Sequence, residues 1–243
     1  MAEPALRIRG LRAGYGRSEI VRGVDLDIAA GEFACILGPN GAGKSTLLRS
    51  VFGLAAQFSG AVSASGVDIS RQTPRQVLAA GISYVPQGRS NFPLMTVADN
   101  LDLATVTRSD ADGVARDIAR SYERFPLLAE HRRSIASNLS GGQQRILEIA
   151  MALLRRPRVL LIDEPSMGLS PQAIGTVFRE LTGLAAEGLT IVLVEQNTRK
   201  AIAVTSRTIV LCQGVIAWDG RSATISQDEL AELFLPRRDG RLK

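Results

Sequence analysis

The sequence predicts an α/β fold with a mainly parallel sheet, an antiparallel β subdomain near the N-terminus and an inserted helical subdomain. Short apolar runs that suit buried strands alternate along the chain with amphipathic stretches that suit helices. One apolar run, Glu32 to Leu37, leads directly into a glycine-rich loop. The segment from Thr96 to Arg133 shows helical patterning alone. We therefore expect an α/β core that a helical subdomain at about 88–155 interrupts.

The first part of the chain has the alternation of half-buried strands. Residues 6–11 and 20–28 place apolar side chains at every second position. Residues 60–70 predict a short hairpin that turns at Ser65 and Gly66, because glycine accepts the backbone angles of a tight turn. These segments predict the antiparallel subdomain.

The central elements follow a strand–loop–helix order. The strand from Glu32 to Leu37 precedes a helix predicted over Ser45 to Phe52, which Gly53 ends. A second apolar strand covers Ile82 to Val85.

Helices and buried strands make up the rest of the chain. Within the helical segment, Asp110 is the expected cap of the second helix. Val159–Ile162 and Thr190–Val194 predict buried strands, separated by a helix over residues 171–187. A further helix is indicated by an apolar stripe at helical spacing: Ile146, Ile149, Ala150, Leu153 and Leu154.

Composition excludes several classes of protein. Hydrophobic residues make up 45% and charged residues 22%, and no apolar run approaches the ~18 residues of a membrane span. The N-terminus lacks the pattern of a signal peptide, so we expect a cytoplasmic protein that contacts a membrane only through partners. The net charge is +5, but no aromatic residues accompany the scattered arginines, so we expect no nucleic-acid partner.

Three residues and the tail have ordinary explanations. We expect Cys35 and Cys212 to be buried free thiols, and His131 to be a surface histidine without a metal. We expect residues 1–235 to form a single domain, and the basic tail 236–243 to be disordered.

A phosphate-binding loop matches the pattern G-x-x-x-x-G-K-[ST]. In this pattern backbone N–H groups and a helix N-terminus bind phosphate oxygens. Lys44 is expected to reach the β- and γ-phosphates, and the Ser45 hydroxyl to bind Mg²⁺. This lysine is one of only three, against 26 arginines. The motif predicts a P-loop NTPase core with nine candidate ATP-binding residues: Gly38, Pro39, Asn40, Gly41, Ala42, Gly43, Lys44, Ser45 and Thr46.

Two acids follow the apolar strand Val159–Ile162. Asp163 is expected at the carboxyl edge of the sheet, where it can hold Mg²⁺. Glu164 can polarise a water for attack on the γ-phosphate. The alternative is two acids in an ordinary turn, which the phosphate loop disfavours.

The heptapeptide Leu139 to Arg145, LSGGQQR, carries the most specific signal. Ser140, Gly141 and Gly142 begin a helix, which gives a second anion site that one subunit does not need. An ordinary Ser-Gly-Gly cap is the alternative. With the phosphate loop and the acidic strand end, this motif makes the chain resemble an ATP-binding cassette. That resemblance implies a head-to-tail dimer in which the signature of one subunit closes over the ATP of the other.

The resemblance implies further site residues. Tyr15 matches the aromatic residue that stacks on adenine, although a strand-edge tyrosine is the alternative. Gln87 matches the glutamine that reaches Mg²⁺ and the attacking water; an exposed loop glutamine is the alternative. The candidate catalytic set is therefore Glu164, Gln196, Gln87 and Lys44, and the candidate Mg²⁺ ligands are Ser45, Gln87 and Asp163.

Two positions depart from the common cassette pattern. Ser170 stands where many cassettes have an aspartate. Gln196 stands where most have a histidine that senses the γ-phosphate; glutamine donates a hydrogen bond but does not titrate. The departures allow a degenerate cassette or slower hydrolysis, but Glu164 and Lys44 are intact and favour an active ATPase.

Motifs around Gln87, after Glu164 and at Val194–Asn197 resemble one branch, the smaller ATPase subunit of branched-chain amino-acid importers, whose relatives handle urea and short amides. The resemblance covers about residues 6–235. It implies a second ATPase subunit, two permease subunits and, indirectly, a periplasmic binding protein. An exporter ATPase remains an alternative. A translation or DNA-repair cassette and a P-loop kinase are more remote, because the chain has one cassette, no room for a coiled coil, and a signature that a kinase does not use.

Overall fold

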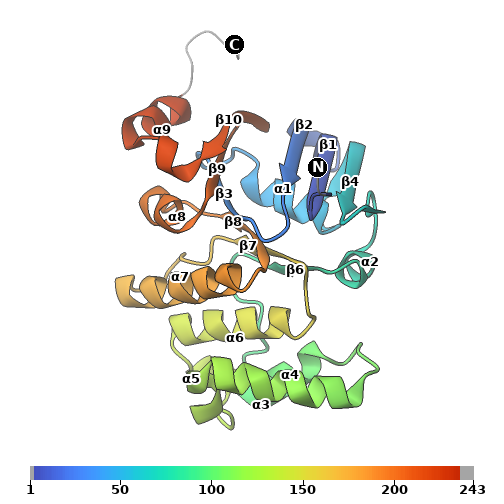
Figure 1. Cartoon of the computed structure of the whole chain (residues 1–243), viewed down its shortest axis with the longest axis vertical. Coiled ribbons are helices and arrows are strands. Elements are labelled where there is room, and N and C mark those ends of the chain that lie inside the picture. Colours follow the sequence, from blue (N-terminus) through green and yellow to red (C-terminus); the bar gives the residue numbers. More distant parts are fainter. Residues whose placement is uncertain (1–2, 236–243) are drawn as a thin grey trace.

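The computed structural model describes residues 3–235, so the predicted basic tail 236–243 lies outside the described residues. Figure 1 shows a mixed sheet in the middle of the molecule, an antiparallel sheet beside it and a group of helices at the opposite end. The predicted fold class is confirmed.

The central sheet of the described residues has six strands, five of which form a run of parallel neighbours. β3, β8, β7 and β6 pair in parallel in that order, and β9 pairs in parallel with β3 on its other side. Only β10 is antiparallel. In spatial order the strands are β10 (Val215–Arg221), β9 (Arg207–Cys212), β3 (Phe33–Leu37), β8 (Thr190–Val194), β7 (Val159–Asp163) and β6 (Ile82–Val85).

The second sheet is antiparallel. Its order is β2 (Ser18–Ile28), β1 (Leu6–Tyr15), β4 (Ala56–Ala64) and β5 (Val67–Asp68). The predicted hairpin turns at Ser65 and Gly66, which have φ of 46° and 81°. Two successive residues in the left-handed region give the turn type that matches the twist of paired strands.

Helices cover the central sheet and build the far end of the molecule. In chain order the α-helices are α1 (Lys44–Val51), α2 (Pro74–Ala79), α3 (Val97–Ala104), α4 (Ala111–Arg124), α5 (Pro126–Glu130), α6 (Gly141–Leu153), α7 (Pro171–Ala186), α8 (Thr198–Val204) and α9 (Gln227–Phe234). Short 3₁₀ turns cover Ala136–Asn138 and Ser222–Thr224. In Figure 1, α3 to α6 lie together below the central sheet.

The central sheet is buried on both faces by two apolar clusters. In β3, Cys35 and Leu37 belong to the cluster that packs under α6 and α7, whereas Ala34 and Ile36 belong to the cluster against α1 and the antiparallel sheet. β7 and β8 alternate in the same way. Strands buried on both faces need continuous apolar runs, which explains why these strands were recognisable in the sequence.

Several local expectations need correction. Asp110 occupies the N-cap position of α4, but its side chain makes no capping hydrogen bond; Arg108 donates to both of its oxygens instead. Cys35 is buried as expected. Cys212 is only half-buried, and its thiol donates to the carbonyl oxygen of Leu233 in α9. His131 is half-buried rather than fully on the surface, since its ring lies 3.4 Å from the Gln143 amide.

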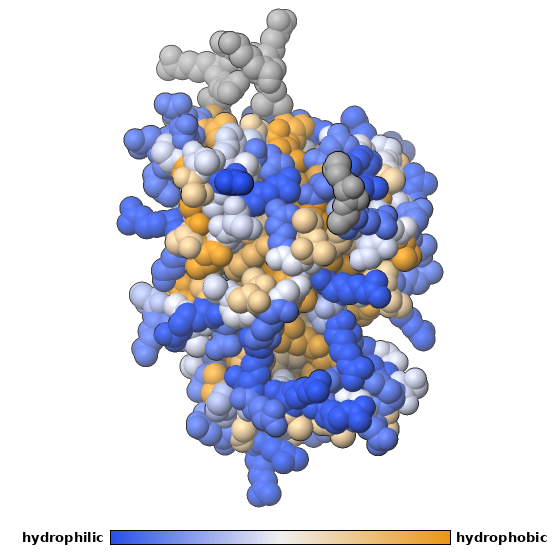
Figure 2. Space-filling model, viewed as in Figure 1, coloured by the Kyte–Doolittle hydropathy of each residue, from blue (hydrophilic) through white to orange (hydrophobic). Residues whose placement is uncertain are grey.

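The face shown in Figure 2 is largely hydrophilic, and apolar side chains gather in a hollow at its middle. None of the helices within residues 3–235 has the length and apolar character that a membrane span requires.

Candidate active site

The carboxyl ends of four adjacent parallel strands bring the predicted site residues together. β3 leads into the phosphate loop, β8 into Glu195 and Gln196, β7 into Asp163 and Glu164, and β6 into the loop with Gln87. Carboxyl ends of neighbouring parallel strands are where α/β sheets bind ligands. The structure therefore assembles at one sheet edge residues that lie more than a hundred positions apart in the sequence.

The phosphate loop forces its backbone into conformations that need glycine. Gly43 caps α1 with φ of 102°, and Gly41 has φ of 79°. A Cβ on Gly38 would collide with the Leu211 carbonyl oxygen. Side chains at these positions would strain the loop or push it away from the strand. The loop therefore ends with its N–H groups at the amino end of α1, an arrangement suited to anions.

Lys44 is the first residue of α1 and is buried. Its Nζ donates to the carbonyl oxygens of Gly38 at 2.8 Å and Pro39 at 3.1 Å. Burial lowers the pKa of Lys44, and the charges of Glu164 and Asp163 act in the opposite direction. A buried ammonium held only by carbonyl oxygens is ready to exchange them for phosphate oxygens, which carry full charge.

Asp163 is completely buried, and a hydroxyl donates to each of its oxygens. Ser45 Oγ donates to Oδ1 at 2.8 Å, and the Tyr84 hydroxyl donates to Oδ2 at 3.1 Å. Burial raises the pKa of Asp163 against these hydrogen bonds. One carboxylate and one hydroxyl side by side form the sparse all-oxygen set that suits Mg²⁺, which keeps its waters and takes phosphate oxygens.

Two side-chain amides hold the carboxylate of Glu164. Gln87 Nε2 donates to Oε2 at 2.9 Å, and Gln196 Nε2 donates to both oxygens at 2.8 Å. Glu164 also has φ of 47°, in the left-handed region that a side chain rarely adopts. Strained backbone persists only where the surroundings hold it, and it concentrates at functional sites. All three residues were predicted from the sequence, and the structure places them in contact.

A buried ion pair fixes the loop that carries Gln87. Arg145, in α6, donates to the carbonyl oxygens of Pro86 at 3.1 Å and Gly88 at 3.0 Å. It also pairs with Glu148 at 2.7 Å, and both side chains are buried. Glu148 in turn accepts from the Ser90 amide. Removing one member of such a pair costs about 3–5 kcal/mol, so α6 and this loop should move as one body.

The signature turn lies apart from this cluster. Ser140 caps α6 in a reciprocal capping box with Gln143. Ser140 and Gly141 are exposed, and Gly142 packs against Ala173 of α7. Within the described residues, no hydrogen bond uses the Gly141 or Gly142 amide, and none joins the turn to Lys44, Asp163 or Glu164. The first amides of a helix have no partner inside the helix, so they remain available as donors.

Tyr15 lies at the end of β1 and is 42% exposed. Arg49 of α1 donates to its hydroxyl at 3.5 Å, which holds the ring loosely. An exposed aromatic face beside the phosphate-loop helix is compatible with stacking on a flat ring. Ser170, the position that departs from the common pattern, caps α7 through a bond from the Ala173 amide.

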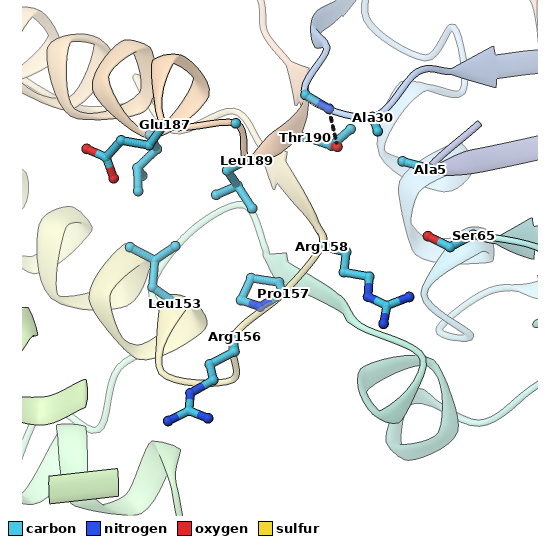
Figure 3. A pocket seen from close by; sticks show the side chains of 13 residues that line it. Ala5, Ala30, Ser65, Leu153, Arg156, Pro157, Arg158, Glu187, Leu189 and Thr190 are labelled. Atoms are coloured by element: carbon cyan, nitrogen blue, oxygen red, sulfur yellow. Dashed lines mark hydrogen bonds between the residues drawn. The ribbon is translucent and has the colours of Figure 1, made fainter. Parts of the chain in front are cut away.

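The pocket in Figure 3 lies at the other end of the sheet. It has a volume of about 510 Å³, and its lining includes Arg158, Leu189 and Thr190, which come just before or at the start of β7 and β8. The candidate active site lies where the same strands end. The pocket is therefore separate from the assembled polar residues.

Two residues of the cluster escaped the sequence analysis. The sequence pattern predicts Tyr84 only as part of a strand, although it lies three residues before Gln87 and donates to Asp163. Glu195 was read only as part of a motif, yet it is buried and accepts four hydrogen bonds. A charged residue directly after a fully apolar strand was the available signal, and it is the signal that found Asp163.

Comparison with known proteins identifies the family. A family model described as ABC transporter matches residues 21–167. The chain is 37% identical to the probable branched-chain amino acid transport ATP-binding protein LivF of Archaeoglobus fulgidus, over 93% of this chain and 96% of that protein. It is 38% identical to the octopine permease ATP-binding protein P of Rhizobium meliloti, over 98% and 96%.

A solved structure extends the similarity to the whole fold. An ATP-binding cassette of an ABC transporter superposes with a TM-score of 0.86 at 25% identity, covering 97% of this chain and 100% of that one. The agreement spans both sheets and the helices between them. The chain belongs to the ABC transporter family, and it is an ATP-binding subunit that hydrolyses ATP.

Proposed function

We propose that this ATPase powers a membrane importer for branched-chain amino acids, through ATP-driven closure of a dimer of ATPase subunits. The hydrogen-bonded trio of Glu164, Gln87 and Gln196 at the sheet edge supports a working hydrolytic site more than any other observation. The name of the relative LivF and the branch motifs around Gln87 and at Val194–Asn197 support the solute.

The proposed ATP site uses the phosphate loop and one aromatic residue. Lys44 binds the β- and γ-phosphates, Tyr15 stacks on adenine, and the loop amides cradle the phosphates. The full set on this chain is Tyr15, Gly38, Pro39, Asn40, Gly41, Ala42, Gly43, Lys44, Ser45 and Thr46. Ser45, Asp163 and Gln87 would hold Mg²⁺, which supplies charge neutralisation on the phosphates when bound.

In the proposed reaction, Glu164 accepts a hydrogen bond from the attacking water and polarises it toward the γ-phosphate. Gln196 donates an amide N–H, which suits a developing negative charge and holds the Glu164 carboxylate in place. Gln87 donates to the same carboxylate and lies in the loop that Arg145 holds, so it links the position of Glu164 to the position of this loop. Each of these groups contacts another before substrate arrives, so little reorganisation is needed at the moment of reaction.

The proposed dimer explains the signature turn. At the start of α6, the Gly141 and Gly142 amides have no hydrogen-bond partner among the described residues, and Ser140, Gly141 and Gly142 include no acid or base. A second ATPase subunit would supply the ATP that these donors bind, and its own signature would complete the site at Lys44. Association then depends on ATP, because the nucleotide lies between the two chains.

The proposed permease contact lies on the helical subdomain, for which we propose the bounds 88–155 within a single domain 1–235. Phe92 and Leu94 follow the Gln87 loop and are 45% and 84% exposed, and Ile135, which forms a β-bridge with Thr96, is 36% exposed. Exposed apolar side chains that follow the Gln87 loop suit a membrane-subunit contact. This arrangement would place the chain on the cytoplasmic side of the membrane, bound to two permease subunits. A periplasmic binding protein would deliver the solute to these permease subunits.

Uptake of labelled solutes tests the proposal. A strain that lacks the gene should lose uptake of leucine, isoleucine and valine. The wild-type gene should restore uptake, and Glu164→Gln should not; Glu232→Gln, an exposed acid on α9, is the matched control and should restore it. Loss of urea or short-amide uptake with normal leucine uptake would contradict the solute and favour that alternative. Unchanged import with a defect in export would favour an exporter.

A further inference from the structure

Glu195 follows β8 directly and is 1% exposed, yet its carboxylate accepts four hydrogen bonds. The Ser166 amide donates to Oε1 at 2.9 Å, and the Ser166 hydroxyl donates to Oε2 at 2.8 Å. The amides of Gln196 and Asn197 donate to Oε2 at 3.0 and 3.2 Å. Both oxygens therefore accept hydrogen bonds, one at Oε1 and three at Oε2, and three of the four donors are backbone groups.

The charge of Glu195 has no cation to balance it. Among residues 3–235, no lysine, arginine or histidine forms an ion pair with this carboxylate. A buried carboxylate without a cation is costly unless several N–H groups converge on it. The amino end of α8, which starts at Thr198, adds a favourable dipole. The Glu195 carboxylate is thus stabilised by hydrogen-bond donors and a helix dipole instead of by a cation.

The hydrogen bonds to Glu195 connect two segments that lie next to Glu164. Ser166 lies two residues after Glu164, and Gln196 donates to Glu164 through its side chain. The Glu195 carboxylate therefore fixes the main chain at Ser166, just after Glu164. It also fixes the main chain of Gln196, whose side chain contacts Glu164. If the Glu195 carboxylate were lost, the angle at which Gln196 meets Glu164 would no longer be fixed.

We propose that Glu195 is a positioning residue of the ATPase reaction, which orients Gln196 and, through it, the Glu164 carboxylate. This role rests on the proposed hydrolytic role of Glu164 and deepens it. Glu195 does not touch the substrate, because its oxygens are buried and occupied. It acts on the turnover step rather than on nucleotide affinity, since the phosphate loop shares none of its hydrogen bonds.

A neutral amide cannot replace this carboxylate. Glutamine offers one acceptor oxygen and one NH₂ group, and the NH₂ would meet N–H donors. Glu195→Gln therefore keeps an acceptor at only one of the two oxygen positions and places an NH₂ group against the Ser166 amide or against the Gln196 and Asn197 amides, with almost no change in volume. Glu232→Gln makes the same chemical change at an exposed position and is the matched control.

The test measures kcat, KM and equilibrium ATP binding for the full chain in the assembly that shows ATPase activity. We expect Glu195→Gln to lower kcat by ~10- to 100-fold while ATP binding stays within ~2-fold, the pattern of an interaction that acts on the transition state. In a Gln196→Ala background, adding Glu195→Gln should cost less than ~2-fold more, because residues in one network are not additive. Glu232→Gln should match the wild type.

Three results would overturn the proposal: a kcat of Glu195→Gln within ~2-fold of wild type, an equal loss in ATP binding, or a full additional loss in the Gln196→Ala background. If Glu195→Gln does not fold, Ser166→Ala removes only one hydroxyl donor and should lower kcat by ~3- to 10-fold with unchanged ATP binding. An unchanged kcat for Ser166→Ala would then overturn it.

Glu164→Gln in the same preparation separates this proposal from the one it rests on. If Glu164→Gln hydrolyses ATP at the wild-type rate, the proposed hydrolytic site is wrong. If Glu164→Gln is inactive and Glu195→Gln is normal, only the positioning role of Glu195 is wrong.

Discussion

The sheet edge that carries the proposed hydrolytic residues and the signature turn of α6 are built in opposite ways. At the sheet edge, Lys44, Asp163 and Glu164 are buried, and each already has at least two hydrogen-bond partners within the chain. At the signature turn, Ser140 and Gly141 are exposed, and the first amides of the helix have no partner among the described residues.

The difference fits two proposed tasks: hydrolysis at the sheet edge and recognition of a partner's nucleotide at the signature turn. A preorganised group reacts without waiting for its surroundings to reorganise, so the hydrolytic residues need a complete internal network. A helix N-terminus that binds another molecule's ligand must stay open instead. The chain therefore combines a preassembled half, which we propose is catalytic, with an open half, which we propose a second subunit uses.

The largest expected effect comes from breaking the catalytic half. Glu164→Gln should bind ATP but hydrolyse it at least ~100-fold more slowly, the scale of losing a general base. Phosphate release and ATP binding, measured on the same sample, check this. Turnover near the wild-type rate would remove Glu164 from the chemistry.

Lys44→Ala should weaken ATP binding by ~10- to 100-fold, because a charge-assisted hydrogen bond contributes about 1.5–3 kcal/mol. Titration calorimetry with ATP measures the loss. Lys200→Ala, which removes a cation outside the phosphate loop, is the control. Equal affinity for Lys44→Ala and wild type would mean that the phosphate loop does not bind ATP.

Tyr84→Phe should have a smaller effect, since it removes one hydroxyl from Asp163 and leaves the ring against Phe52. We expect the Mg²⁺ concentration at half-maximal ATPase activity to change by ~3- to 10-fold, the scale of one hydrogen bond to a charged group. An unchanged Mg²⁺ dependence would show that Tyr84 does not position Asp163.

Gln196→His should add a pH dependence that glutamine lacks, because an amide does not titrate. Histidine has an ordinary pKa of about 6.5, and the adjacent Glu164 carboxylate favours the charged imidazolium, which raises that pKa. As pH falls through this value, the imidazolium should hold Glu164 more firmly and lower kcat. Rate profiles from pH 6 to 8 test this, and a profile parallel to that of wild type would contradict the contact.

The sequence predicted most of the fold and most of the site. Buried parallel strands such as Val159–Ile162 are legible because both faces are apolar, and Asp163 and Glu164 stood out against them. Tyr84 and Glu195 were missed because their roles depend on contacts across strands, with Asp163 and Ser166. The side-chain cap at Asp110 was wrong because Arg108 competes for the same carboxylate.

The central claim is that the signature turn serves a partner's ATP, and a dimer with two placed mutations tests it. Glu164→Gln disables one hydrolytic half. Gly141→Asp puts a carboxylate at the start of α6, where it suits the helix dipole but repels phosphate. Gln227→Asp, at the first position of α9, is the matched control and should be silent.

The two changes are placed either in one subunit or in opposite subunits. If the dimer consists of two copies of this chain, the copies carry different tags. If the partner is a different ATPase subunit, the change is made at its corresponding signature glycine. The account predicts that both changes in one subunit abolish ATPase activity, because each of the two sites then carries one defect. Placed in opposite subunits, they should fall on the same site and leave about half of the activity in an otherwise symmetric dimer. The reverse result, with activity kept when both changes share a subunit, would show that each signature serves its own ATP and would contradict the account.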